Sequence, residues 1–219
     1  MGTSPFRNLG KRGDGAVTDN AAPRRGERRP LPNFRHRLTR AQQREYDRSN
    51  AVAAIPLRPT PRLGRAVYLL EWALAHDDRP RTAHVAQVIC DELCAVLRVR
   101  PLRVQVKAER PSDARGELHG LYQSAGRREV ISIWMLTAKR GQVVAYRTFL
   151  RTLVHEMGHH LDYQLLGLRD SFHTDGFFRR ESSLVSQLLA AARRAAMPAP
   201  AAAAAAAPPP GRPSLSRRP

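Results

Sequence analysis

The stretch that decides the fold of this chain is TLVHEMGHHLDYQL, residues 152–165. Apolar residues recur in it at spacings of three and four, which is typical of an amphipathic α-helix packed on a core. The same stretch contains the sequence HEMGH at residues 155–159. Residues four apart lie on one face of a helix, about one turn from each other, so both imidazoles can reach a single ion. The stretch therefore predicts a buried helix that carries two ligands of a metal site.

The residue types in this motif suit zinc. Neutral imidazoles such as those of His155 and His159 are ordinary zinc ligands, and the carboxylate of Glu156 would project toward a metal-bound water. Zn²⁺ lowers the pKa of its water and polarises a carbonyl, while a carboxylate takes the proton and passes it to the leaving amine. The motif predicts a zinc-dependent metallopeptidase that hydrolyses peptide bonds, with Zn²⁺ as cofactor and Glu156 as catalytic base.

A catalytic zinc takes three protein ligands and keeps one position open. His173 is the best candidate for the third ligand, because it follows a short loop after the helix stop at Gly167. Asp175 and Glu181 are the alternatives, and Glu181 would give a site of two histidines and one glutamate. The metzincin pattern is excluded, because it requires a histidine where this chain has Leu165.

Two further polar residues stand close to the motif. His160 adjoins His159 but points about 100° away around the helix, so it is expected at the surface or beside the site rather than as a ligand. Asp162 lies one turn past His159 on the same face. Its carboxylate would either accept the second N–H of a ligand imidazole or form a salt bridge with an arginine. In the last helix, Arg179 and Arg180 are expected on a solvated face.

The HEMGH motif and the downstream FHTDGFF (172–178) together resemble the SprT-like zinc peptidases. In that family a helical HExxH is followed, after a loop, by a histidine, two or three residues and a phenylalanine. The residues that match are His155, Glu156, His159, His173 and Phe177. The resemblance implies a minimal zincin with His173 as third ligand and Glu156 as base. Thr174 departs from the family, which usually has glycine after the third histidine.

The hydrophobic period changes along the rest of the chain. The predicted elements are helices over 62–78 and 82–98, strands over 102–109, 118–124 and 130–136, and helices over 143–166 and 174–196. This order predicts an α+β fold. With the resemblance, it becomes a minimal zincin-like domain in which a small antiparallel sheet packs on the HExxH helix. By analogy with zincins, 118–124 or 130–136 would supply a sheet edge that aligns an extended peptide substrate.

Composition divides the chain into three parts. Residues 62–197 form the predicted zincin-like metallopeptidase domain. Residues 1–61 are rich in Arg, Pro and Gly and are predicted to be a disordered basic segment, apart from a short helix within 38–50. Such a segment buries too little apolar surface to offset its ordering entropy. Residues 198–219 are predicted to be a disordered Ala/Pro-rich tail.

The formal net charge is +18, from 37 Lys and Arg against 19 Asp and Glu. The excess is densest in residues 1–61, which carry 13 basic and 5 acidic side chains. Basic tails of this kind would bind nucleic acid non-specifically through its phosphates. The alternative function is therefore a nucleic-acid-associated protein with Arg-rich arms and a secondary or inactive zincin domain. A purely structural metal domain is disfavoured, because structure requires ligands but no base such as Glu156.

The remaining features concern compartment. Cys90 and Cys94 are the only cysteines and stand in an apolar helical pattern, which indicates core packing in a reducing compartment. No apolar run is long enough to span a membrane, and the first residues are polar. We expect a cytoplasmic protein that acts on a protein or peptide substrate and has no membrane partner.

Overall fold

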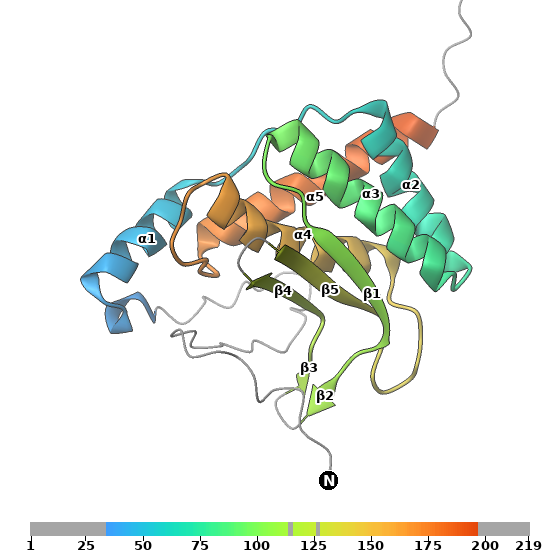
Figure 1. Cartoon of the computed structure of the whole chain (residues 1–219), viewed down its shortest axis with the longest axis horizontal. Coiled ribbons are helices and arrows are strands. Elements are labelled where there is room, and N and C mark those ends of the chain that lie inside the picture. Colours follow the sequence, from blue (N-terminus) through green and yellow to red (C-terminus); the bar gives the residue numbers. More distant parts are fainter. Residues whose placement is uncertain (1–33, 114–115, 126–127, 197–219) are drawn as a thin grey trace, which may run out of the picture.

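The computed structural model describes residues 34–113, 116–125 and 128–196. Within these ranges the elements are η1 (Phe34–Arg37), α1 (Arg40–Ala51), α2 (Pro61–Ala75), α3 (Arg79–Leu97), β1 (Arg103–Glu109), β2 (Ser112–Asp113), β3 (Gly116–Glu117), β4 (Gly120–Ala125), β5 (Arg128–Leu136), α4 (Tyr146–Gln164) and α5 (Asp175–Ala196). The described chain is α+β, as predicted, with its helices around a small three-stranded sheet (Figure 1).

The sheet is mixed, so the prediction of an antiparallel sheet is wrong for β1. The strand order is β1-β5-β4, with β4 and β5 antiparallel and β1 parallel to β5. Between β1 and β4 the chain forms the separate two-stranded pair of β2 and β3. Residues 131–135 of β5 are all buried. A strand buried on both faces takes the central position, which places β5 between the other two strands.

Helix α4 packs on the sheet through β4 and β5 (Figure 1). Its buried apolar residues follow one another at helical spacing: Phe149, Leu150, Leu153, Val154, Met157 and Leu161. Each such side chain contributes about 1.5–3 kcal/mol when it is fully buried. This face fixes the rotation of α4 about its axis, and with it the direction in which His155 and His159 point.

Helices α2, α3 and α5 complete the core. α2 contacts both α3 and α5, and α3 contacts β1. The α2–α5 crossing is close at Gly64, where an added Cβ would lie 2.8 Å from the carbonyl oxygen of Ala191. Cys90 and Cys94 lie buried in α3 as free thiols, and burial raises the pKa of Cys94 to about 11. Both cysteines therefore pack in the core, away from any metal site.

The N-terminal boundary lies earlier than predicted. Residues 34–60, expected to be disordered apart from a short helix, contain η1, α1 and an extended segment. In that segment Ile55 is buried, and the side chain of Gln187 in α5 bonds to the carbonyl of Ile55 at 2.9 Å and to the N–H of Leu57 at 2.7 Å. This packing could not be predicted from the polar composition of the segment, because the segment is held to α5 by hydrogen bonds as well as by apolar contacts.

Residues 1–33 of the predicted N-terminal segment and the whole predicted C-terminal tail, residues 198–219, lie outside the described residues, as does any nucleic-acid binding through them. Among the helices that are described, none combines the length and the apolar character needed to cross a membrane.

Candidate metal centre

Three histidines from two elements converge beside the sheet. His155 and His159 lie on α4, and His173 lies on the loop between α4 and α5. The Nε2 atom of His173 is 3.0 Å from Nε2 of His155 and 3.2 Å from Nε2 of His159. The three side chains lie close enough together to bind a metal ion. Among the described residues, no other group of three or more His, Cys, Asp or Glu side chains does so. The two rival ligands, Asp175 and Glu181, do not belong to it.

The loop after α4 brings His173 back to the helix. α4 ends at Gln164, and Gly167 adopts a positive φ of 60°, which permits a sharp reversal of the chain. The N–H of Leu168 then donates to the carbonyl of Asp162 at 2.9 Å. At the far end of the loop, the hydroxyl of Thr174 accepts from the N–H of Phe177 at 3.0 Å and caps α5. His173 thus lies between a hydrogen-bonded turn at Gly167 and the capped N-terminus of α5.

Each of the two histidines that α4 contributes to this group has its second ring nitrogen bonded to an oxygen. Nδ1 of His155 lies 2.9 Å from a carboxylate oxygen of Glu181, whose other oxygen lies 3.0 Å from Arg151. Nδ1 of His159 lies 2.8 Å from the hydroxyl of Ser171. An oxygen partner at Nδ1 fixes both the tautomer and the ring orientation of a ligating histidine.

Asp162 lies behind Ser171 and forms the predicted salt bridge, but the second ring nitrogen of His159 bonds to Ser171 and not to Asp162 itself. The hydroxyl of Ser171 donates to one carboxylate oxygen of Asp162 at 2.7 Å, and the guanidinium of Arg180 donates to the other at 2.7 Å. Asp162 therefore forms a salt bridge and also acts on His159 indirectly, through Ser171.

The hydrogen-bond pattern is the one that a metal ion between the three histidines would require. The carboxylate of Glu181 can only accept, so Nδ1 of His155 carries the proton. Ser171 gives its own proton to Asp162, so Nδ1 of His159 must donate to Ser171. Both Nε2 atoms then present lone pairs toward Nε2 of His173, which can satisfy at most one of them. Nitrogens around a tetrahedral zinc lie roughly 3.3 Å apart, close to the separations found here.

Burial keeps two of the three rings neutral. It lowers the pKa of His159 well below the usual range, and the neighbouring His155 and His173 lower it further. Burial likewise lowers the pKa of His173 to about 4. For His155, burial also opposes the charged form, but the hydrogen bond to Glu181 and the nearby carboxylates raise the pKa. Neutral imidazole is the form that binds a metal ion.

Glu156 lies buried between α4 and the edge strand β4. Only 6% of the residue is exposed, and its carboxylate accepts a hydrogen bond from the N–H of Tyr122. Gly120 of β4 leaves the space for it, since an added Cβ there would lie 2.8 Å from Cγ of Glu156 and would clash with the carboxylate. Burial raises the pKa of Glu156 to about 7, although His155 and the Tyr122 N–H act to lower it.

His160 is fully buried and does not belong to the group of three histidines. Its Nε2 atom bonds to the carbonyl of Arg100 at 2.8 Å, and its Nδ1 atom lies 3.2 Å from the hydroxyl of Tyr122. The Tyr122 ring in turn lies 6.4 Å from the His159 ring, between centroids. Of the two positions expected for His160, the one at the surface is wrong and the one beside the site is found, where His160 bonds to Tyr122.

Ser171 and Arg180 are the site residues that the sequence analysis missed. Arg180 was expected on a solvated face, but it is 3% exposed. A signal was present in the sequence, since Arg180 and Glu181 fall at helical spacing between Phe177 and Leu184, on the buried side of α5. Charged residues at such positions indicate buried polar partners.

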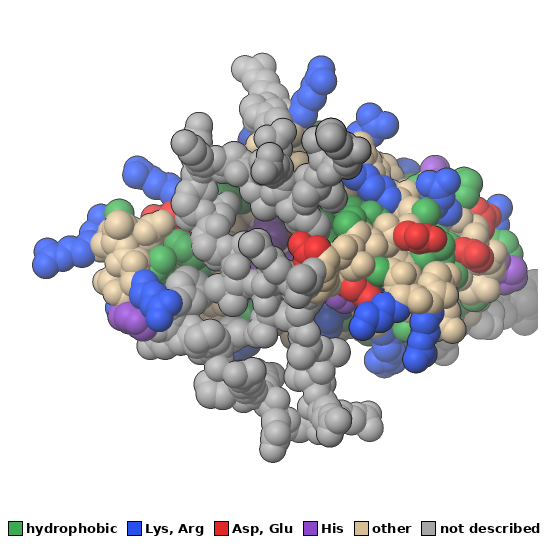
Figure 2. Space-filling view, turned by 90° about the horizontal axis from the view of Figure 1, so that it is seen from below, with side chains coloured by type: hydrophobic (Ala, Val, Ile, Leu, Met, Phe, Trp, Pro, Cys, Tyr) green, Lys and Arg blue, Asp and Glu red, His purple; other side chains and the backbone are tan. Residues whose placement is uncertain are grey.

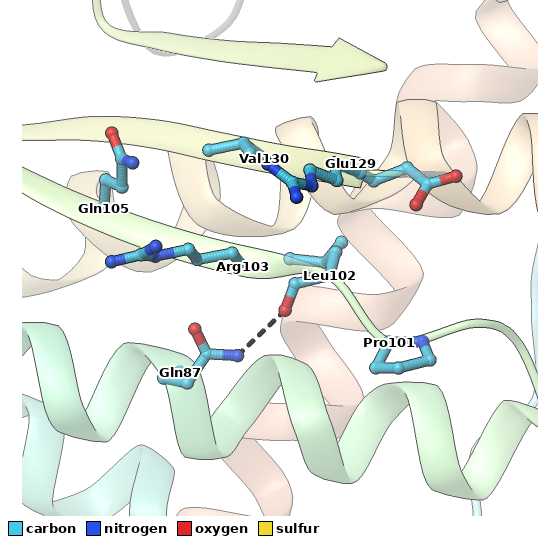
Figure 3. Close-up of a pocket in the computed structure, with 8 residues that line it drawn as sticks. Gln87, Pro101, Leu102, Arg103, Gln105, Glu129 and Val130 are labelled. Carbon is cyan, nitrogen blue, oxygen red and sulfur yellow. Dashed lines mark hydrogen bonds between the residues drawn. The ribbon is translucent and has the colours of Figure 1, made fainter. Parts of the chain in front are cut away.

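The surface around the site is mixed in charge. Figure 2 shows histidine side chains near the middle of one face with an acidic side chain beside them, while Lys and Arg are spread around the periphery. A separate open groove of about 560 Å³ lies between α3 and the sheet, and none of its lining residues is a histidine. There the Gln87 side chain donates to the Leu102 carbonyl at 2.9 Å (Figure 3). That groove belongs to the packing of α3 on β1.

Comparisons of the chain with protein-family models, with curated proteins and with solved structures found no match. The function of the chain is therefore inferred from the geometry of the histidine cluster and its surroundings.

Proposed function

We propose that this chain is a zinc-dependent metallopeptidase of the SprT-like kind, with a zincin-like fold. The observation that carries the proposal is the convergence of three histidine Nε2 atoms beside a buried glutamate at the open edge of a sheet. A structural metal site needs only the ligands. Glu156 adds a base whose carboxylate is not engaged in holding any of the three histidines.

His155, His159 and His173 would hold the zinc ion. Three neutral imidazoles are a typical donor set for a catalytic zinc, which keeps its fourth position open for the reaction. A zinc ion in this place supplies Lewis-acid chemistry, because it polarises a carbonyl oxygen and makes water a stronger acid. The oxygen partners at Nδ1 of His155 and His159 direct both Nε2 lone pairs toward the same point.

Glu156 would move the proton. Its carboxylate takes a proton from the attacking water and delivers it to the nitrogen of the leaving amine. The N–H of Tyr122 fixes the orientation of the carboxylate, and Gly120 leaves room for it against the strand. The buried setting keeps bulk water from competing for that proton.

The substrate would bind along β4. This strand pairs with β5 on one side, and no other strand among the described residues pairs with its outer side. The opposite edge of the sheet is less open, because the Gln87 side chain bonds to Leu102 and Val104 at the start of β1. An extended peptide can add to a free edge through main-chain hydrogen bonds. Its scissile bond would then pass Glu156 beside Gly120.

The test measures metal content and hydrolysis on the full chain. The purified protein should bind about one zinc and cleave casein, and chelation should abolish the cleavage. Glu156→Gln should keep the zinc and lose the cleavage, since an amide of the same shape cannot take a proton. Glu71→Gln, at an exposed position on α2, is the matched control. Near-wild-type hydrolysis by Glu156→Gln would exclude Glu156 as the base.

A further inference from the structure

A single buried guanidinium joins the N-terminal helix to the metal-ligand helix. Nη1 of Arg180 donates to the carbonyls of Ser49 at 2.5 Å and Val52 at 2.7 Å, where α1 ends. Nη2 donates to the Ser49 hydroxyl at 3.0 Å and to Asp162 on α4 at 2.7 Å. The last carbonyls of a helix lack partners within it and carry partial negative charge, so they attract a cation. Arg180 therefore binds α1 and α4 at the same time.

From Asp162 the same chain of contacts reaches a metal ligand. The other carboxylate oxygen of Asp162 accepts from Ser171, which accepts from Nδ1 of His159. Arg180, Asp162, Ser171 and His159 thus form a continuous series of hydrogen bonds. If Arg180 were absent, Asp162 could rotate away from Ser171, and the proton position on His159 would no longer be fixed.

A second set of contacts joins α1 to the residues next to His173. The Ser49 hydroxyl lies 3.3 Å from the hydroxyl of Thr174, which follows His173 directly and caps α5. The side chain of Asn50 accepts from the N–H of Gly176 at 2.9 Å. α1 and α5 meet so closely here that a Cβ on Gly176 would lie 2.5 Å from the Asn50 carbonyl oxygen and 2.6 Å from that of Ser49.

The loop itself is also bound to α1. The N–H of Arg169 donates to Glu45 at 3.1 Å, and Arg48 donates to the carbonyl of Leu166 at 3.2 Å. The Tyr46 ring lies 6.1 Å from that of Phe172, the residue before His173. α1 therefore contacts the loop near its beginning, its middle and its end.

We propose that α1 and Arg180 form a clasp that positions His159 and His173 for the metal, so that the metal centre extends to the N-terminal helix. Arg180 and Asp162 act as positioning residues and do not touch the metal. Burying such an ion pair costs desolvation energy, and an apolar pair of similar size is often as stable. The Arg180–Asp162 ion pair lies between α1 and Ser171, the serine that orients His159. This positioning role explains why a charged pair occupies the place. The inference rests on the metal site proposed above.

The test is a double-mutant cycle on the full chain, read by zinc affinity in a competition titration. Arg180→Met and Ser171→Ala should each weaken zinc binding roughly 10- to 100-fold. Because Arg180 acts on His159 through Asp162 and then Ser171, Arg180→Met should have a much smaller effect in the Ser171→Ala background. A residue that served only the stability of the fold would give the same loss in both backgrounds, and that result would overturn the proposal.

Two further variants cover the case in which Arg180→Met does not fold. Arg180→Lys keeps the charge but cannot reach both helices, and it should weaken zinc binding less than Arg180→Met does. Gly176→Ala removes no polar group and pushes α1 away from α5, so it too should weaken zinc binding. Arg193→Met, at an exposed position on the same helix, is the matched control.

The Co²⁺-loaded proteins provide a readout of ligand geometry, and their absorption spectra should change in Arg180→Lys and Gly176→Ala but not in Arg193→Met. Wild-type zinc affinity and an unchanged Co²⁺ spectrum in folded Gly176→Ala would overturn the clasp and leave the peptidase proposal intact. Failure of the unmodified chain to bind zinc at all would overturn both.

Discussion

The carboxylate of Glu181 lies 2.9 Å from Nδ1 of His155, on the side of the ring opposite to the Nε2 atom that meets His173. Glu181 is 4% exposed, and its second oxygen is paired with Arg151. Glu181, which the sequence offered as an alternative ligand, is bonded to His155 and lies outside the group of three histidines. This contact predicts different effects for a variant of Glu181, which bonds to a histidine of the group, and for a variant of His173, which belongs to the group.

Glu181→Ala should weaken zinc binding without abolishing it. The variant removes the acceptor that holds the Nδ1 proton of His155, and loss of such a partner costs roughly 10- to 100-fold in metal affinity. Glu181→Gln keeps an acceptor oxygen and should lose less. Competition titration of both variants gives the ranking. Loss of the zinc stoichiometry itself in Glu181→Ala would place the carboxylate among the ligands.

His173→Ala should lower zinc affinity by more than Glu181→Ala does, because it removes a ligand rather than the partner of one. Metal analysis after dialysis should find little zinc in the variant. His84→Ala, an exposed histidine on α3, serves as the control and should keep about one zinc per chain. Equal zinc retention by the two variants would contradict the assignment of His173.

Gly120→Ala should reduce hydrolysis while the zinc content stays unchanged. The added methyl group would clash with the Glu156 carboxylate, whereas no hydrogen bond described for the three histidines involves Gly120. A displacement of about 1 Å in a catalytic group can cost about 10²-fold in rate. The measurement is kcat/KM on casein together with metal analysis. Full activity in the variant would show that Glu156 does not work from its position against β4.

Removal of residues 1–61 should destabilise the domain, whereas removal of residues 1–33 leaves every described contact in place. The longer deletion takes away α1 and the buried Ile55, which contributes about 1.5–3 kcal/mol, as well as the partners of Gln187. The expected fall in Tm is roughly 5–10 °C, measured by calorimetry. The same Tm in both truncated chains would mean that residues 34–61 add nothing to the fold.

Local periodicity accounts for what could be predicted correctly. The spacing of His155 and His159 places both on one face of α4, and the buried apolar residues along the helix orient that face. Spacing alone could not select the third member of the histidine group, because three downstream residues, His173, Asp175 and Glu181, were all compatible with it. His173 joins the cluster because the reversal at Gly167 and the Thr174 cap return the loop to α4. The glycine and the capping threonine can each be recognised in the sequence, but where they direct the loop depends on how α4 and α5 pack.

The sequence by itself determined the helices, most of the strands and the pair of histidines on α4, because each depends on residues within a turn or two of one another. Only the tertiary structure decided the place of β5 between β1 and β4, which depends on burial from both faces. It also decided the roles of Arg180 and α1, which contact each other although they lie more than 100 residues apart along the chain. A polar segment can fold when distant buried groups satisfy it, and that information is absent from its own composition.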